Sequence, residues 1–182
     1  VFGKKPEGYD ESLSIGKVKC FYGNFLVALR AAVYIDTLGA EGIKDAAQKA
    51  VLNANYLMEG LKEFYPVAYD RVCMHEFVLT LENLKHEKGV SAMDVAKAML
   101  DYGIHPPTMY FPLIVHEDLM FEPTETETKE TLDEAIRVLG EIRQIAEKDA
   151  QSLHEAPHRT IIGRVDEVRA ARQPVLKYAF ND

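Results

Sequence analysis

The sequence predicts an α+β fold in which helices pack on a small, mostly antiparallel sheet. Segments with helical spacing of apolar residues are separated by short stretches of strand character, in the order helix, helix, strand, strand, helix, strand, helix and tail. This order contains neither an internal repeat nor the βαβαβ run of a parallel sheet. The 182 residues, 47% hydrophobic and 27% charged, are enough for one domain with its own core.

The first two elements are predicted helices. Residues 22–38 have an apolar centre in which Arg30 is the only charge, which predicts a buried helix with Gly39 as its C-terminal cap. Residues 41–64 follow with one apolar stripe and charged residues off it, which predicts an amphipathic helix. The stripe consists of Ile43, Ala47, Ala50, Val51, Ala54, Leu57, Met58, Leu61 and Phe64.

The middle of the chain predicts two strands and a third helix. Residues 67–69 and 76–82 have strand character, and the polar run 83–89 reads as a loop. A helix then begins at Ser91, with Asp94 as a capping-box partner, and closes at Gly103.

The second half begins irregularly and ends in a long helix. Residues 109–115, interrupted by a proline, predict an edge strand or an extended loop, and 119–122 predict a strand. Threonines and glutamates at 124–128 precede an amphipathic helix that runs to Leu153. The expected division is an N-terminal extension or linker over 1–21, the α+β domain over 22–156, and a surface-packing tail over 157–182.

Charge and cysteine content exclude several classes of function. Lys and Arg total 21 against 29 Asp and Glu, a net charge of −8, which argues against binding to nucleic acid or to anionic membranes. Cys20 and Cys73 form no CxxC pair and have no metal-type histidine spacing, so neither a disulfide framework nor a metal site is expected. Without a spanning or signal segment, the expected compartment is a reducing cytoplasm.

Two histidines are candidates for proton transfer. His75 precedes a predicted strand beside Glu76, and His105 lies in a proline-flanked turn that presents its imidazole in a fixed geometry. For each, a structural role at the end of a strand or in a turn is the alternative.

Polar residues at two helix starts are further candidates. Tyr22 and Asn24 flank Gly23 at the first helix, where they line a pocket or simply follow a glycine turn. Residues 124–127 form either part of a site or a helix cap, and capping alone accounts for them.

Taken together, six sequence motifs resemble the glycine dehydrogenase (decarboxylating) family, the P-protein of the glycine cleavage system, and most closely subunit 2 of its split bacterial form. The resemblance covers nearly the whole chain from Ser14, with the motifs in the order of the family. They lie at 14–25 (SIGKV to FYGNF), 50–57 (AVLNANYL), 74–77 (MHEF), 105–114 (HPPTMYFPLI), 122–127 (EPTETE) and 166–172 (DEVRAAR).

The resemblance implies a fold and an activity. The family is an oxidoreductase that uses pyridoxal 5′-phosphate to decarboxylate glycine and passes the aminomethyl group to the lipoyl arm of the H-protein. The implied fold is the small C-terminal domain of the aspartate-aminotransferase type (fold type I). The cofactor ring acts as the electron sink in such chemistry, while the protein orients the bond to be broken.

One departure from the family pattern concerns the cofactor. The cofactor lysine of the family lies in a His-Lys-Thr motif upstream of the Ser-Ile-Gly segment, and this sequence contains no such motif. We therefore expect about the last third of a longer enzyme, which neither binds the cofactor tightly nor catalyses alone.

Residue by residue, the resemblance places Tyr22, Asn24, His75, His105, Thr108 and Thr124 at the rim facing the entrance for glycine or the lipoyl arm. No arginine occurs between Arg71 and Arg137 to bind the glycine carboxylate. A helix start at Thr124 is the alternative anion site, although adjacent glutamates oppose it.

Two other functions remain open. The chain is alternatively a non-catalytic assembly domain that holds subunit 1 and subunit 2 together in a heterotetramer, with the tail 159–180 as a docking arm. A free-standing α+β domain that binds a small molecule is the third possibility.

Overall fold

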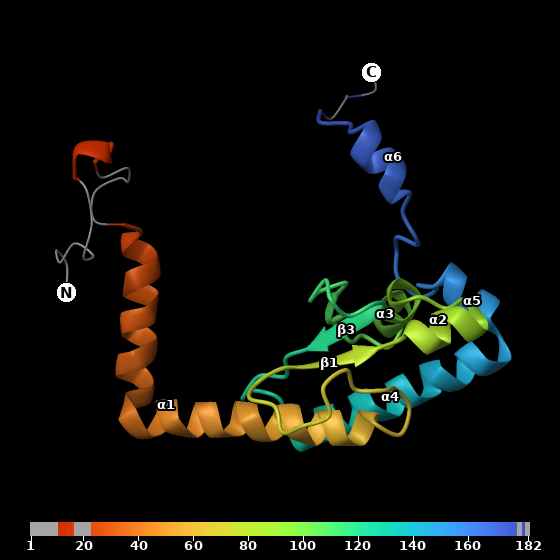
Figure 1. Ribbon diagram of the computed structural model, residues 1–182, viewed down its shortest axis with the longest axis horizontal. Coiled ribbons are helices and arrows are strands. Elements are labelled where there is room, and N and C mark those ends of the chain that lie inside the picture. Colours follow the sequence, from red (N-terminus) through yellow and green to blue (C-terminus); the bar gives the residue numbers. More distant parts are fainter. Residues whose placement is uncertain (1–10, 17–22, 178–179, 181–182) are drawn as a thin grey trace. The chain divides into compact units, whose positions relative to one another are not determined.

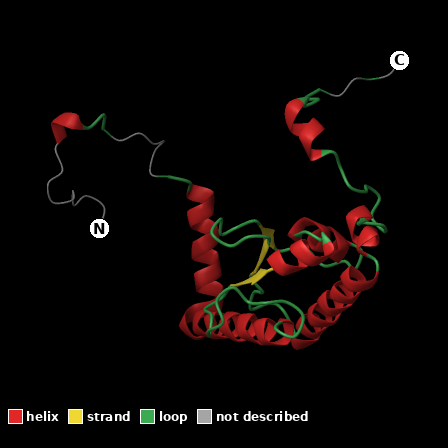
Figure 2. Cartoon of the chain, turned by 45° about the vertical axis from the view of Figure 1, so that its right-hand side comes forward, coloured by secondary structure: helices red, strands yellow, loops and turns green. Residues whose placement is uncertain are grey.

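The computed structural model describes residues 11–16, 23–177 and 180. The chain divides into two compact units, Val1–Ile43 and Lys44–Asp182. Its described elements are shown in Figures 1 and 2 and are, in order, η1 (Glu11–Leu13), α1 (Phe25–Leu61), β1 (Phe77–Thr80), α2 (Glu82–Lys88), α3 (Ala92–Leu100), β2 (Thr108–Met109), β3 (Asp118–Phe121), α4 (Lys129–Lys148), α5 (Ala150–Glu155) and α6 (Glu167–Arg172). The α+β class is confirmed; the predicted division at residues 21 and 156 stays a prediction.

The two predicted N-terminal helices are both present as α1, which is interrupted at Gly39. The glycine adopts φ 64° and ψ −176°, outside the helical region, so the two helical segments meet there. The prediction that the first segment is buried is wrong for the described chain. Phe25, Leu26 and Val33 are each more than half exposed. The sequence pattern therefore predicted the helix correctly but not the exposure of its apolar side chains.

The sheet has three antiparallel strands in the order β1-β3-β2. Phe77 of β1 pairs with Phe121 of β3, and the two rings stack with centroids 5.5 Å apart. The predicted strand at 67–69 is reduced to a single bridge between Val67 and Leu79. The segment 109–115 contributes only Met109 to β2 and otherwise forms a loop.

The predicted loop at 83–89 is wrong, because these residues form helix α2. The helix is mostly hydrophilic, and Leu84 is its one buried residue. Gly89 ends the helix with φ 75°. The capping box of α3 is confirmed: Ser91 Oγ accepts a hydrogen bond from the Asp94 N–H, and the Asp94 carboxylate accepts one from the Ser91 N–H.

The predicted long C-terminal helix is divided at Asp149 into α4 and α5. Thr128 caps α4 by accepting a hydrogen bond from the Thr131 N–H, so the helix begins at Lys129, five residues beyond Thr124. The tail contains one further helix, α6, whose residues are exposed.

The core of the second unit lies among the sheet and helices α1 to α5. In Figure 1 the part of α1 after Gly39 and helix α4 run below β1 and β3. Ala54, Leu57, Met58 and Leu61 form the buried part of the predicted α1 stripe. None of the described helices is long and apolar enough to cross a membrane.

Candidate functional site

One end of the sheet gathers most of the predicted site residues. Antiparallel pairing places the start of β1 beside the end of β3, and the start of β2 beside that same end. His75 lies two residues before β1, Thr108 opens β2, and Glu122 directly follows β3. His75 Nε2 lies 3.9 Å from a carboxylate oxygen of Glu122 and 3.9 Å from one of Glu76. Glu122 belongs to the 122–127 motif but is not among the predicted site residues, because its approach to His75 depends on strand pairing.

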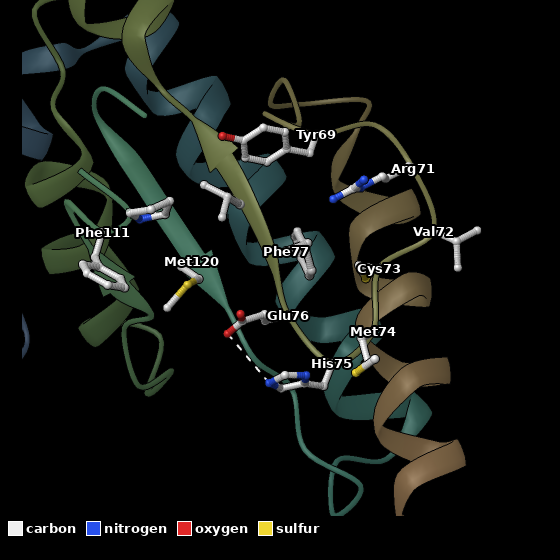
Figure 3. A pocket seen from close by; sticks show the side chains of 12 residues that line it. Tyr69, Arg71, Val72, Cys73, Met74, His75, Glu76, Phe77, Phe111 and Met120 are labelled. Carbon is white, nitrogen blue, oxygen red and sulfur yellow. Dashed lines mark ion pairs between the residues drawn. The ribbon is translucent and has the colours of Figure 1, made fainter. Parts of the chain in front are cut away.

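The His75 recess is a cavity of about 520 Å³ beside β1. Figure 3 shows His75 and Glu76 on the segment that leads into β1 at Phe77, and the part of the chain before them runs beside α1. The recess is lined by Tyr69, Arg71, Val72, Cys73, Met74, His75, Glu76, Phe77, Val78, Phe111, Pro112 and Met120. Cys73 is a free thiol, and its burial raises its pKa, which lowers the fraction of reactive thiolate at neutral pH.

The His105 recess is a second cavity, of about 720 Å³, between the turn 102–108, the end of β3 and helix α4. It includes His105 and Thr108, and Met120 of β3 borders both recesses. Its base is apolar, with Leu57, Ile104, Phe121, Leu132 and Ala135, and its polar lining includes four carboxylates, from Glu122, Glu127, Glu130 and Glu134. No lysine or arginine lines it among the described residues, although Arg137, outside the lining, forms an ion pair with Glu134. The other three carboxylates favour cations over anions in this recess.

The remaining predicted site residues lie apart from these recesses or outside the described residues. Thr124 does not line the His105 recess, although its neighbour Pro123 does, and its hydroxyl lies 2.7 Å from that of Thr126. Because Thr128 caps α4, the N-terminal dipole of that helix is not centred on Thr124. Asn24 belongs to the first unit, where its side chain accepts a hydrogen bond from the Val27 N–H; Tyr22 lies outside the described residues.

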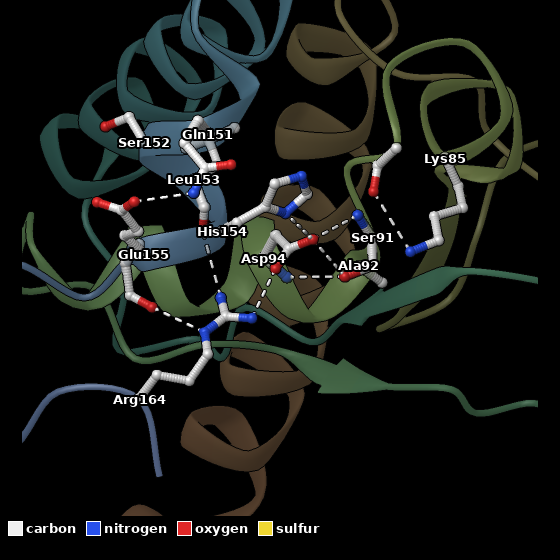
Figure 4. Close-up of polar contacts among 12 residues, drawn as sticks. Lys85, Ser91, Ala92, Asp94, Gln151, Ser152, Leu153, His154, Glu155 and Arg164 are labelled. Atoms are coloured by element: carbon white, nitrogen blue, oxygen red, sulfur yellow. Dashed lines mark hydrogen bonds and ion pairs between the residues drawn. The ribbon is translucent and has the colours of Figure 1, made fainter. Parts of the chain in front are cut away.

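A separate polar cluster holds the start of the tail. Asp94 is buried, and its carboxylate accepts a hydrogen bond from Arg164 Nη1 at 2.7 Å and lies 3.2 Å from His154 Nδ1 (Figure 4). Asp101 accepts hydrogen bonds from the N–H groups of His158 and Arg159. No group of three or more His, Cys, Asp or Glu side chains has metal-binding geometry in the part of the chain that the structure describes.

The fold and this sheet-end arrangement define a small α+β domain with two recesses at one end of its sheet. A solved structure of the glycine decarboxylase (P-protein) of the glycine cleavage system, in inhibitor-bound form, is similar with a TM-score of 0.55 and 28% identity, over 64% of this chain and 26% of that one. The family model for the glycine dehydrogenase C-terminal domain matches residues 46–161. The chain belongs to this family.

Curated relatives extend the similarity to nearly the whole chain. A probable glycine dehydrogenase (decarboxylating) subunit 2 from Treponema denticola is 61% identical over 93% of this chain and 35% of its own length. The corresponding proteins of Caldanaerobacter subterraneus and Thermosipho melanesiensis are 58% and 53% identical, over 93% and 96% of this chain and 35% and 36% of their own lengths. The chain thus spans about a third of the length of these relatives.

Proposed function

We propose that the chain is the C-terminal domain of subunit 2 of a two-subunit glycine dehydrogenase (decarboxylating). In the whole enzyme, the sheet end that carries His75, His105 and Thr108 forms one rim of the site where glycine is decarboxylated and its aminomethyl group passes to the lipoyl arm of the H-protein. The 61% identity to a subunit 2 across 93% of the chain carries this proposal. Subunit 1 is the proposed partner in a heterotetramer, in the bacterial cytoplasm.

The described residues do not fit a complete site for pyridoxal 5′-phosphate, the cofactor that the resemblance implies. That cofactor needs a lysine amine for its covalent link and cationic or N–H groups for its phosphate. Neither recess is lined by a lysine among the described residues, and the His105 recess presents four carboxylates. We infer that another part of the enzyme holds the cofactor and that this domain lines one side of the active site.

The chemistry of the rim matches that limited role. The imidazole of His75, with Glu76 and Glu122 as neighbours, is placed to exchange a proton with a group that enters the recess. Apolar residues beside it, including Phe111, Pro112 and Met120, exclude water when another domain covers them. The carboxylates of the His105 recess favour the ammonium group of an amino acid and oppose its carboxylate, which another part of the enzyme must therefore bind.

The test is glycine–bicarbonate exchange by the complete enzyme, assembled from both subunits with cofactor and H-protein. His75→Ala and His105→Ala are each expected to lower kcat by at least about tenfold while the subunits still assemble. His86→Ala is the matched control, because this histidine lies on α2 with a 75% exposed side chain and lines neither recess. The 182-residue chain alone is expected to show no exchange and no cofactor absorbance. Wild-type turnover in both recess variants, or exchange by the chain alone, would refute the proposal.

A second candidate function is subunit assembly, and exposed apolar side chains favour it. Leu26, Val33 and Ile35 on α1 are more than half exposed, as are Val175, Leu176 and Phe180 in the tail. Apolar residues gathered in this way on two segments are typical of surfaces that a partner covers. Under this proposal, the domain joins the two subunits and the recess variants leave turnover unchanged.

A further inference from the structure

The Asn53-Ala54-Asn55 segment of α1 carries two asparagines whose side chains form hydrogen bonds with loops outside the helix. Ala54 is fully buried and faces the core. Successive helical residues are about 100° apart, so the asparagines before and after it lie on opposite flanks of the buried stripe. Asn55 contacts the loop before β1, and Asn53 contacts the loop after β3. Both loops adjoin the sheet end where the site residues lie.

Asn55 holds the loop that leads to His75. Its Oδ1 accepts a hydrogen bond from the Cys73 N–H at 3.0 Å, and its Nδ2 donates to the Cys73 carbonyl at 2.8 Å. The second amide hydrogen is donated to the Val51 carbonyl of α1 itself, also at 2.8 Å. One side chain therefore holds both main-chain polar groups of Cys73. Cys73 itself lies two residues before His75 and is labelled with it in Figure 3.

Asn53 holds the turn that follows Glu122. Its Nδ2 donates to the Thr124 carbonyl at 2.8 Å and to the Glu127 carbonyl at 3.0 Å. The turn itself is closed by the Glu127 N–H, which donates to the same Thr124 carbonyl at 3.2 Å. Both hydrogens of this amide are thus used on the main chain between β3 and α4.

We propose that Asn53 and Asn55 are positioning residues, each of which holds the main chain of one loop, so that a single turn of α1 sets two sides of the candidate site. The relevance of these loops to catalysis rests on the proposed function, whereas the positioning itself rests on the five hydrogen bonds. Aspartate cannot replace Asn53, because a carboxylate has no hydrogen to donate to either carbonyl. Glutamine, longer by one methylene, displaces the amide from both sets of partners.

Hydrogen–deuterium exchange on the complete protein tests the inference. In Asn55→Ala, the Cys73 amide is expected to exchange at least about tenfold faster, while the 124–128 segment keeps its protection. In Asn53→Ala, and at least as strongly in Asn53→Asp, the Glu127 amide is expected to exchange faster while the Cys73 segment is unchanged. The amides of α1 should stay protected in the two alanine variants, because alanine is a better helix former than asparagine.

The control is Gln48→Ala, which removes an exposed amide from the same helix and should leave both loops unchanged. If either loop keeps wild-type protection in its own variant, or if each variant loosens both loops equally, the inference is wrong.

Glycine–bicarbonate exchange separates this inference from the proposed function. Selective loosening of each loop together with a severalfold lower kcat supports both. Selective loosening with wild-type kcat and KM supports the positioning role and contradicts the proposed role of this sheet end.

Discussion

At the scale of single residues, Asp94 links three parts of the second unit. It completes the capping box of α3, pairs with Arg164 of the tail and lies beside His154 of α5. Burial by itself raises the pKa of this carboxyl group, but hydrogen bonds from Ser91 and Arg164 outweigh burial and hold the pKa below its ordinary value. The charged form is therefore favoured by folding, and its contribution to stability is present above the unfolded-state pKa and lost as pH falls through the folded-state pKa.

Asp94→Asn is expected to lower the free energy of unfolding by about 1–3 kcal/mol near neutral pH, because it weakens the charge-assisted bonds to Ser91 and Arg164. The loss should begin to shrink at about pH 3.9, the ordinary aspartate pKa that applies to the unfolded chain, and should shrink further as pH falls through the lower folded-state pKa of Asp94. Urea unfolding of the wild type and the variant, near neutral pH and below about pH 3.9, measures this loss in free energy of unfolding. Asp45→Asn is the control, since the Asp45–Lys49 pair is exposed and contributes at most about 0.5 kcal/mol. A loss that is equal at both pH values would contradict this account.

At the scale of elements, the packing of α1 against α4 depends on Gly60. A Cβ atom at Gly60 would lie 2.3 Å from Ile136 Cδ1 of α4, far inside van der Waals contact. One turn away, the Tyr56 hydroxyl donates a hydrogen bond to Asp133 of α4. The two helices can therefore approach closely because Gly60 has no side chain, and the hydrogen bond between Tyr56 and Asp133 adds a polar contact.

Gly60→Ala is expected to destabilise the protein by about 1 kcal/mol, because overpacking against Ile136 outweighs the gain in helix propensity. Ile136→Ala should itself destabilise, yet in the double variant the new methyl group occupies the vacated space. The combined loss in free energy of unfolding should therefore be smaller than the sum of the two single losses by at least about 0.5 kcal/mol, measured by chemical denaturation. Simple additivity would show that the two residues do not compete for this space.

At the scale of the whole molecule, the tail combines an anchored start with an exposed remainder. Arg164 donates hydrogen bonds to Asp94 and to the carbonyls of Leu153 and Ala156, whereas the described residues from Val165 onward are exposed. This arrangement holds the start of the tail and leaves the side chains of Val165, Val168, Val175 and Leu176 more than half exposed.

Truncation after Asp166 is expected to leave the melting temperature of the chain unchanged, because the Arg164 contacts remain. Within the complete protein, the same truncation should weaken the binding of subunit 1 by at least about tenfold, as measured by titration calorimetry. Truncation after Arg159 is the comparison, since it also removes Arg164 and should lower the melting temperature. Undiminished subunit binding by the protein truncated after Asp166 would eliminate the docking role of the arm.

Local patterns were sufficient for most of the elements. The 41–64 stripe, the Ser91–Asp94 capping box and the glycine at 39 each depend on residues near in sequence, so helical periodicity and cap chemistry revealed them. Helix α2 was not predicted because Leu84 is its only residue that reaches the core, so its apolar residues do not recur with helical spacing.

The family, the fold class and the histidines at strand and turn boundaries followed from the printed residues alone. Tertiary structure decided that His75 meets Glu122, which is 47 positions away, and that Asn53 and Asn55 hold two separate loops. It also decided that the cavity beside His105 is acidic. The physical reason is that antiparallel pairing and helix packing bring together groups far apart in the chain, whereas periodicity and caps record only neighbours.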